Sequence, residues 1–428
     1  MKKMIAVFAT IIPCLLFAQK TILHCGKLVD PQNLKVLTEM SVVVEGNKIT
    51  DVQNGYTSGA AGDKIIELKD KTVMPGLIDC HVHMTMQQSP SAFTDKFKMN
   101  PADYAYQSIS YARSTLMAGF TTVRDVGVVG GSTVNISMRN AINKGLIIGP
   151  RMYTAGKIIS STGGHGDVTN GLREDLLGDP GIDDGIANGV DACVKAIRQR
   201  YKEGSDLIKI TASGGVLSME KDGTGAQYSE EEIKAMVQTA KDYGMKVAAH
   251  AHGAEAIKRA VRAGVTSIEH GTFLDDEGIA LMKQNGTWLV PTIIAGKSTA
   301  DSAKKPGYFP EVIAAKAIAI GPKIQSTFGK AYKAGVKIAF GTDAGVYPHG
   351  KNWIEFIYMT EAGMPPLEAI KAATVSAAEL IGITDKVGTI EKNKLADIIA
   401  VDGDPSTDIQ SMGKVKFVMK DGVVYKND

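Results

Sequence analysis

The hydrophobic and polar positions in the central part of the chain repeat in one order. An amphipathic stretch with apolar residues at helical spacing is followed by a glycine and then by a short β-rich run, as expected where a helix ends and a strand begins. The glycines at these junctions are Gly119, Gly145, Gly204, Gly244, Gly264, Gly286 and Gly335. Together with the earlier run MPGLIDCHVH, the pattern predicts eight strands that alternate with helices.

Alternation of this kind favours a closed parallel (β/α)8 barrel of the TIM type, which we place at residues 74–384. An open doubly wound sheet would share the local pattern. The polar residues at the strand ends favour the barrel, because there the carboxyl ends of all strands converge on one face. These residues are His81, His83, Arg124, Asp125, Lys209, His250, His270 and Asp343.

Both ends of the chain follow a different pattern. Short alternating runs such as SVVVEG and VKFVMKDGVVY, separated by glycine, asparagine and aspartate, indicate antiparallel strands. We predict that residues 19–73 and 385–428 pair into one small β-sandwich domain, which would be discontinuous in sequence.

The first residues resemble a secretory signal peptide. Lys2 and Lys3 precede an apolar run that ends at the small residue Ala18, so we expect a signal at residues 1–18 with cleavage after Ala18. The run is shorter than the roughly 20 apolar residues of a membrane anchor. The expected protein is exported, periplasmic or secreted, without stable membrane insertion. Lipidation at Cys14 is disfavoured because the preceding Ile-Ile-Pro lacks small residues.

Composition narrows the function classes. Removing 18 of the 428 residues leaves 410, which suits a large barrel with an accessory domain. The net charge of +2 disappears with Lys2 and Lys3, so no global field attracts nucleic acid. The remaining cysteines, Cys25, Cys80 and Cys193, are odd in number and widely spaced, which does not indicate a disulfide framework.

Histidines at the strand ends are the first candidates for chemistry. His81 and His83 lie two residues apart on an extended run, so both rings point to one side and can bind one metal ion. His250 and His270 end two other strands and Asp343 ends the last, which completes a zinc-type ligand set. Each residue alone is explained equally well as an ordinary polar group at a strand end. Their expected convergence predicts a metal site.

Lys209 lies within the apolar run DLIKITA, where an unpaired ammonium is costly to bury. One explanation is a salt bridge to a neighbour such as Glu269. The other is a lysine that desolvation makes neutral and that captures carbon dioxide, so that the carbamate bridges a metal pair. The local pattern by itself favours the salt bridge.

Other candidates lie in the loops and beside the strand ends. His165 lies in the glycine-rich GGHGD, and Tyr228 precedes a helix that Ser229 begins with a capping box. Both are candidates to bind a substrate carbonyl or carboxylate, or to make a loop hydrogen bond without function. Arg124 is a candidate to hold a carboxylate, but it is expected to pair with Asp125 or another wall residue. His252 lies on the same side of its strand as His250, and spacing alone does not choose the ligand.

Seven segments resemble the amidohydrolase superfamily, in its prolidase-like and imidazolonepropionase-like branch. They are MPGLIDCHVH (74–83), STGGHGD (161–167), IKITASGG (208–215), AAHAHG (248–253), SIEHG (267–271), FGTDAG (340–345) and GTIEKNKLADIIAVDGDP (388–405). This resemblance covers most of the chain and implies a binuclear metallohydrolase with a carboxylated lysine.

The resemblance also implies a role for each residue. Two divalent metal ions, expected to be Zn²⁺, would be bound by His81, His83 and Asp343 at the first ion, by His250 and His270 at the second, and by carboxylated Lys209 as the bridge. Asp343 would also be the catalytic proton shuttle. His252 and His165 would support the oxyanion, and His165, Tyr228 and His252 would contact the substrate.

The implied reaction is hydrolysis of an amide bond in dipeptides or N-acyl amino acids by a metal-bridging hydroxide. The resemblance also makes the phenylalanine amide of ochratoxin A a trial substrate. The alternatives are a cyclic-amide or imidazolone hydrolase on the same fold, and a non-catalytic barrel scaffold. The expected partners are a small peptide or amide and further copies of the chain in a homo-oligomer.

Overall fold

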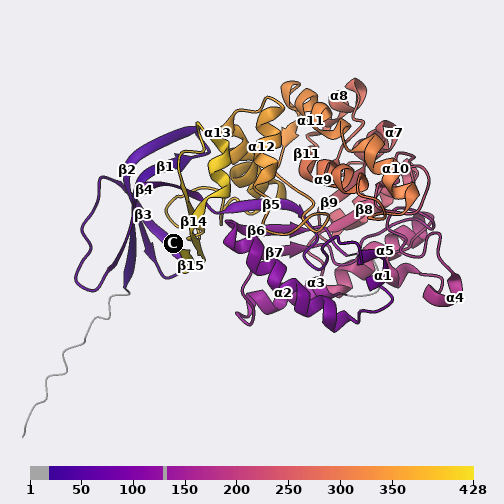
Figure 1. Ribbon diagram of the computed structural model, residues 1–428, viewed down its shortest axis with the longest axis horizontal. Coiled ribbons are helices and arrows are strands. Elements are labelled where there is room, and N and C mark those ends of the chain that lie inside the picture. Colours follow the sequence, from indigo (N-terminus) through magenta and orange to yellow (C-terminus); the bar gives the residue numbers. More distant parts are fainter. Residues whose placement is uncertain (1–18, 129–132) are drawn as a thin grey trace, which may run out of the picture.

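The computed structural model describes residues 19–128 and 133–428 of the protein, so the expected signal peptide at residues 1–18 lies outside the described residues. The chain forms a large α/β part and a smaller β-rich part at one side of it (Figure 1). Among the described residues, no helix is both long enough and apolar enough to cross a membrane.

Each of the eight predicted central strands is present. They are β5 (Leu77–Val82), β6 (Phe120–Asp125), β7 (Arg151–Thr154), β8 (Ile208–Thr211), β9 (Val247–Ala251), β10 (Ser267–His270), β11 (Trp288–Val290) and β12 (Lys337–Ile338). They form two parallel sheets, with the strand orders β5-β6-β7 and β12-β11-β10-β9-β8. The carboxyl ends of all eight strands therefore lie on the same side of the α/β part.

The two parallel sheets adjoin at both edges, although they do not form one continuous barrel sheet. At one edge, the Cys80 amide donates to the Phe340 carbonyl oxygen at 2.9 Å. At the other, the Ile159 amide donates to the Lys209 carbonyl oxygen at 2.9 Å. Gly156, with a φ of +67°, turns the chain between β7 and Ile159, which interrupts the extended ladder. The arrangement is TIM-barrel-like, and isolated parallel bridges such as Val82 with Ala344 and Ile159 with Ile210 link the two sheets.

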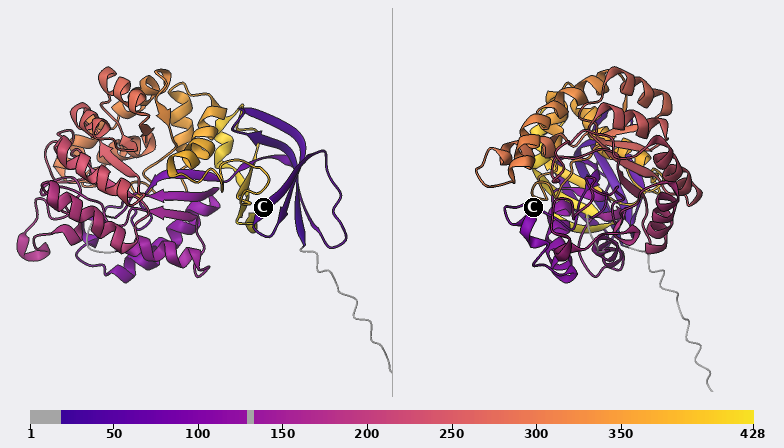
Figure 2. Two further views of the ribbon diagram at one scale, coloured as in Figure 1. Left: turned by 180° about the vertical axis from the view of Figure 1, so that it is seen from behind. Right: turned by 90° about the vertical axis from the view of Figure 1, so that its right-hand side faces the viewer.

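Helices surround these strands (Figure 2). They are α1 (Ala92–Asp95), α2 (Pro101–Met117), α3 (Val134–Asn143), α4 (Glu174–Leu177), α5 (Val190–Glu203), α6 (Glu230–Asp242), α7 (Ala254–Arg262), α8 (Asp276–Asn285), α9 (Ile293–Ala303), α10 (Glu311–Ile320), α11 (Lys323–Lys333), α12 (Ile354–Glu361), α13 (Pro366–Lys371) and α14 (Ala377–Ile381). The predicted capping box is present at α6, where Ser229 and Glu232 cap each other's backbone amides. Gly204 and Gly286 end α5 and α8 in the left-handed conformation that glycine favours.

The two chain ends combine, as predicted, in one β-rich unit. Its strands are β1 (Lys20–Asp30), β2 (Lys35–Glu45), β3 (Lys48–Asn54), β4 (Lys64–Pro75), β13 (Ile398–Asp402), β14 (Val415–Lys420) and β15 (Val423–Asn427). Hydrogen bonds join the seven strands in the order β15-β14-β13-β4-β1-β2-β3. Direct pairing of β4 with β13 joins both ends into one ladder. The expectation of purely antiparallel strands fails, because β1 and β4 are parallel.

A cluster of ion pairs, formed by Arg151, Asp397 and Asp421, connects this sheet to the barrel strands. Arg151, at the start of β7, donates to both carboxylate oxygens of Asp397, at 2.7 and 3.2 Å. It also donates to the carboxylate of Asp421. The side chain of Asp397 is 2% exposed, so its charge depends on Arg151 for compensation.

Replacing Arg151 by methionine should lower the free energy of unfolding by about 3 kcal/mol, because a buried carboxylate loses its partner. Urea denaturation of the two proteins measures the difference. The exposed pair between Lys304 and Asp301 supplies a control, and Lys304→Met should leave the unfolding midpoint nearly unchanged. Equal midpoints for Arg151→Met and the wild type would contradict the proposed fastening.

Candidate active site

A cavity of about 360 Å³ lies at the carboxyl ends of the central strands. Its wall includes eight of the residues singled out in the sequence. They are His81, His83, His165, Lys209, His250, His252, His270 and Asp343. Segments far apart in the sequence therefore meet at one face of the α/β part.

His81 is fully buried and lies between a carboxylate and two candidate metal ligands. Its Nδ1 is 2.7 Å from Oε2 of Glu269. Its Nε2 is 3.5 Å from Nζ of Lys209 and 3.5 Å from Oδ1 of Asp343. Because a carboxylate only accepts hydrogen bonds, Nδ1 carries the hydrogen and Nε2 keeps its lone pair toward Lys209 and Asp343.

His83 and Asp343 continue this arrangement. Nδ1 of His83 donates to the Gly127 carbonyl oxygen at 2.6 Å, and its Nε2 is 3.2 Å from Oδ1 of Asp343. Oδ1 of Asp343 is buried and accepts no hydrogen bond from the described residues. Asp343 also has a φ of +61°, an unusual conformation for a residue other than glycine. A buried carboxylate oxygen without a donor and a strained backbone both indicate a functional position.

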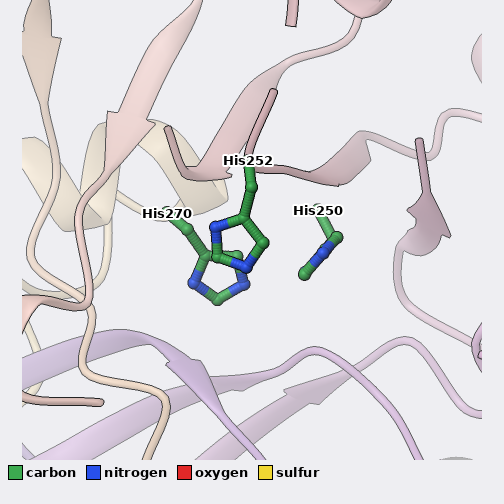
Figure 3. Close-up of side chains that lie close together, drawn as sticks. All are labelled: His250, His252 and His270. Carbon is green, nitrogen blue, oxygen red and sulfur yellow. The ribbon is translucent and has the colours of Figure 1, made fainter. Parts of the chain in front are cut away.

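Three more histidine rings face one another across the ends of β9 and β10 (Figure 3). The ring centroid of His250 is 4.7 Å from the centroid of His252 and 4.7 Å from that of His270. The centroids of His252 and His270 are 4.9 Å apart. Nδ1 of His252 lies 2.8 Å from the hydroxyl of Thr272. The ligand atoms of the three histidines lie within 4.8 Å of one another, so distance admits either His250 or His252 as a metal ligand.

In His250 and His270, a hydrogen bond to one ring nitrogen decides which nitrogen is left to bind a metal ion. Nδ1 of His270 bonds to the hydroxyl of Thr292 at 2.7 Å, which leaves Nε2 free. Nε2 of His250 donates to the Gly214 carbonyl oxygen at 3.0 Å, which leaves Nδ1 free. The ligand atoms of His270 and Asp343 also lie within 4.8 Å of those of His81, so the two sets of ligands share one cavity.

Lys209 is 3% exposed, and burial lowers the pKa of its ammonium to about 8, although Glu269 and Asp343 raise it. The salt bridge to Glu269 that the local pattern favoured is not formed. Glu269 instead accepts from Arg124 at 2.8 Å and from His81. Among the described residues, no carboxylate lies within 4.0 Å of the Lys209 ammonium.

The two candidate substrate contacts outside the strands fall in different places. His165 lines the cavity, and its ring stacks on His250 at 4.3 Å between centroids. Tyr228 does not line the cavity, so the expectation that it contacts substrate is corrected. Its side chain is buried under α6, and its hydroxyl donates to the Ala187 carbonyl oxygen at 3.1 Å.

Most of the remaining cavity wall is apolar, and the sequence pattern did not single out its individual residues, although several lie in the segments 213–228 and 293–310 where substrate contacts were expected. It includes Met86, Phe93, Met99, Leu217, Met219, Tyr308, Phe309, Ile313 and Ile320. Glu269 and Arg124 lie behind His81, and from the sequence they were predicted only as residues that could form an ion pair. The sequence feature that could have identified their supporting role is a charged residue within an apolar strand.

The profile of the Amidohydrolase family matches residues 72–425, which is most of the chain. The chain belongs to the amidohydrolase family. Members of this family are hydrolases, and the match includes every candidate metal ligand described above.

Individual relatives resemble the chain along nearly its whole length. Ochratoxinase from Aspergillus niger is 31% identical over 436 aligned positions, covering 96% of this chain and 87% of that protein. The crystal structure of a Xaa-Pro dipeptidase with bound methionine in the active site is 50% identical, with a TM-score of 0.92 and coverage of 96% and 100%. A prolidase complexed with N-methylphosphonate-L-proline is 32% identical, with a TM-score of 0.85 and the same coverage. These relatives support hydrolysis of an amide bond.

Glu355 supports one wall of the cavity from behind. Its buried carboxylate accepts the first backbone amides of α9, from Ile293 at 2.8 Å and from Ile294 at 2.7 Å. The preceding residue, Thr292, holds the ring of His270. Burial raises the pKa of Glu355 from its ordinary value of 4.5 to about 8.

The raised pKa of Glu355 predicts a pH-dependent stability. Between about pH 5 and about pH 8 the folded protein holds a proton on Glu355 that the unfolded chain has released, so the contribution of Glu355 to the free energy of unfolding should fall as pH rises. The buried histidines, whose pKa values burial lowers, act in the opposite direction below about pH 6.5 and are present in both proteins. Glu355→Gln removes the Glu355 titration, so the difference in free energy of unfolding between wild type and variant should fall as pH rises. Asp79, whose pKa burial raises to about 7, titrates in both proteins. Urea denaturation across this pH range measures both slopes, and parallel curves would contradict the prediction.

Proposed function

We propose that the protein is a binuclear metallo-amidohydrolase that cleaves the amide bond of dipeptides or N-acyl amino acids. The observation that carries the proposal is the convergence of buried histidines, Lys209 and Asp343 in one cavity, with ligand atoms left free. The names of the relatives, ochratoxinase, Xaa-Pro dipeptidase and prolidase, support the same class of reaction.

The donor set fits two divalent cations. The proposed ligands are His81, His83 and Asp343 for one ion, His250 and His270 for the other, and carboxylated Lys209 between them. Each of the four histidines has one ring nitrogen hydrogen-bonded to the protein, as metal-binding histidines do. The unpartnered Oδ1 of Asp343 supplies an acceptor that a cation would satisfy.

Lys209 suits the bridging role for two reasons. Burial favours its neutral amine, which is the form that reacts with carbon dioxide. Its ammonium lies beside Nε2 of His81 and has no carboxylate partner among the described residues, so a modification would break no ion pair. A carbamate would replace a costly buried cation with an anion that offers two oxygen ligands.

Bound cations, which we expect to be Zn²⁺, would lower the pKa of water toward neutrality and polarise the scissile carbonyl. The chain's own residues move the protons. Asp343 takes a proton from the attacking water and gives it to the leaving amine. His252 lines the cavity beside His250 and His270, and its Nε2–H can donate to the oxyanion when Nδ1 accepts from the hydroxyl of Thr272.

The apolar lining of the cavity favours a substrate with an apolar side chain. Aromatic and aliphatic side chains such as Phe93, Met219 and Phe309 form much of its wall. A structural relative holds methionine in its active site, and another relative is an ochratoxinase. We therefore propose dipeptides with methionine, proline or phenylalanine at the C-terminus, N-acyl phenylalanine and ochratoxin A as trial substrates.

Metal analysis combined with this substrate panel tests the proposal. We expect about two metal ions per chain and hydrolysis that a chelator abolishes. About one ion would favour the cyclic-amide or imidazolone hydrolase. A metal-free protein that cleaves none of the substrates would favour a non-catalytic scaffold.

Export and homo-oligomerisation remain part of the proposal. Export is supported by Lys2 and Lys3 before the apolar run that ends at Ala18. N-terminal sequencing of protein recovered outside the cytoplasm tests the cleavage, and light scattering of the purified protein tests its oligomeric state.

The Asp343→Asn variant should keep most of its metal, because one ligand oxygen remains, and lose turnover by about 10²- to 10⁴-fold, because an amide cannot shuttle the proton. Elemental analysis and steady-state kinetics on one substrate measure both effects. An unchanged kcat would exclude Asp343 as the shuttle.

The Lys209→Ala variant should lose the bridged metal pair and its activity, and a short carboxylic acid should restore part of both by filling the space of the carbamate. The exposed lysine of α5, Lys195, supplies the control. Lys195→Ala should keep its metal and its activity, and an added carboxylic acid should change neither. Full activity of Lys209→Ala without added acid would exclude the bridge.

A further inference from the structure

A chain of hydrogen bonds connects the loop after β8 to His165. The hydroxyl of Ser218 lies 2.6 Å from Nδ1 of His165 and donates to Oε1 of Glu220 at 2.6 Å. The same Oε1 accepts the backbone amide of Gly215 at 2.8 Å. Ser218 and His165 both line the cavity, whereas Glu220 lies behind them.

The directions of these hydrogen bonds follow from their chemistry. An ionised carboxylate only accepts, so the hydroxyl proton of Ser218 points to Glu220. The alternative acceptor, the Gly215 carbonyl oxygen, is 3.5 Å away and therefore much weaker. The Ser218 oxygen can then only accept from His165, so Nδ1 of the neutral ring carries the hydrogen.

Lys316 holds the same loop from α10. Its ammonium donates to the carbonyl oxygens of Gly215, Ser218 and Glu220, each at 2.7 Å. These three bonds use every donor of the ammonium. The side chain is buried, and the charges of Lys316 and Glu220 attract each other. Lys316 therefore fixes the loop that carries Ser218.

The remaining nitrogen of His165 is available to a ligand. The ring is held by its stacking on His250, with an interplanar angle of 25°, and the side chain is 23% exposed. Among the described residues, none hydrogen-bonds to Nε2, while Nδ1 is committed to Ser218. The atom that His165 offers to the cavity is thus Nε2, with a lone pair in place of a hydrogen.

We propose that Ser218, Glu220 and Lys316 are positioning residues that fix the Nδ1–H tautomer of His165, so that Nε2 accepts a hydrogen bond from a donor on the substrate. An amide N–H or a free amino group would be such a donor. The inference rests on the proposed function for its substrate and changes one expectation, because a neutral His165 of this tautomer cannot donate to an oxyanion. That role is left to His252.

Nitrogen NMR of the metal-free protein with labelled histidine tests the tautomer without any activity. The His165→Gln variant identifies the His165 signals. We expect a protonated Nδ1 and an unprotonated Nε2 in the wild type. In Glu220→Gln the new carboxamide can donate to Ser218, whose hydroxyl then turns to Nδ1, so the Nε2–H form should increase. An Nε2–H tautomer in the wild type would overturn the inference.

Kinetics of the metal-loaded enzyme test the consequence for substrate. Ser218→Ala and Glu220→Gln should lower kcat/KM by about 10- to 100-fold, the loss that follows when the supporting partner of a metal-binding histidine is removed, with metal content unchanged. Ser218→Thr keeps the hydroxyl and should retain most of the activity. The matched control is Ser326→Ala on α11, where an exposed hydroxyl bonds only within its helix. The loss of kcat/KM in these two variants should be smaller for an ester analogue of the substrate that has neither the amide N–H nor the free amino group.

The two proposals fail in different ways. A wild type that cleaves no substrate would refute the amidohydrolase activity, and the NMR measurement would still decide the tautomer. An active wild type with Ser218→Ala and Glu220→Gln within about twofold of it would refute the positioning role, as would equal losses on the amide and the ester.

Discussion

The site depends on one constraint. One ring nitrogen of each buried histidine must form a hydrogen bond with the protein, so that the other nitrogen can face a ligand. Glu269 holds Nδ1 of His81, and Thr292 holds Nδ1 of His270. A buried polar atom without a partner is costly, so these supporting groups select both the tautomer and the orientation of each ring. Arg124 in turn compensates the charge of Glu269, so the orientation of His81 depends on both residues.

The backbone carries part of the same constraint. His270, Thr292 and Asp343 all have positive φ values, of 73°, 53° and 61°, where the chain leaves a strand and must turn its side chain into the cavity. Such conformations persist only where the surroundings enforce them. Asp79 provides such enforcement, because its carboxylate accepts the amide and hydroxyl of Thr342, directly before Asp343.

The floor and the roof of the cavity have different origins. The floor consists of strand ends that bring the candidate ligands together, whereas the roof consists of loops and of α10. Lys316 joins two parts of this roof by binding three carbonyl oxygens of one loop. In the proposed function, the strand ends therefore supply the chemistry, and the loops and α10 contact the substrate.

Local patterns were sufficient for the eight strands and for the histidines and Asp343 at their ends, because glycine at a helix end and the two-residue repeat of a strand act within a few residues. The bridging role of Lys209 and the choice of His250 over His252 came from the family resemblance. Histidines at strand ends needed only the barrel topology to converge. Tertiary structure decided the rest: that Glu269 pairs with Arg124, so that Lys209 has no carboxylate partner in the described part of the chain, and that Tyr228 is packed away from the cavity. It also decided that β4 joins β13 in one sheet. These pairings join residues distant in sequence, and the choice among competing partners depends on burial and distance, which exist only in the folded chain.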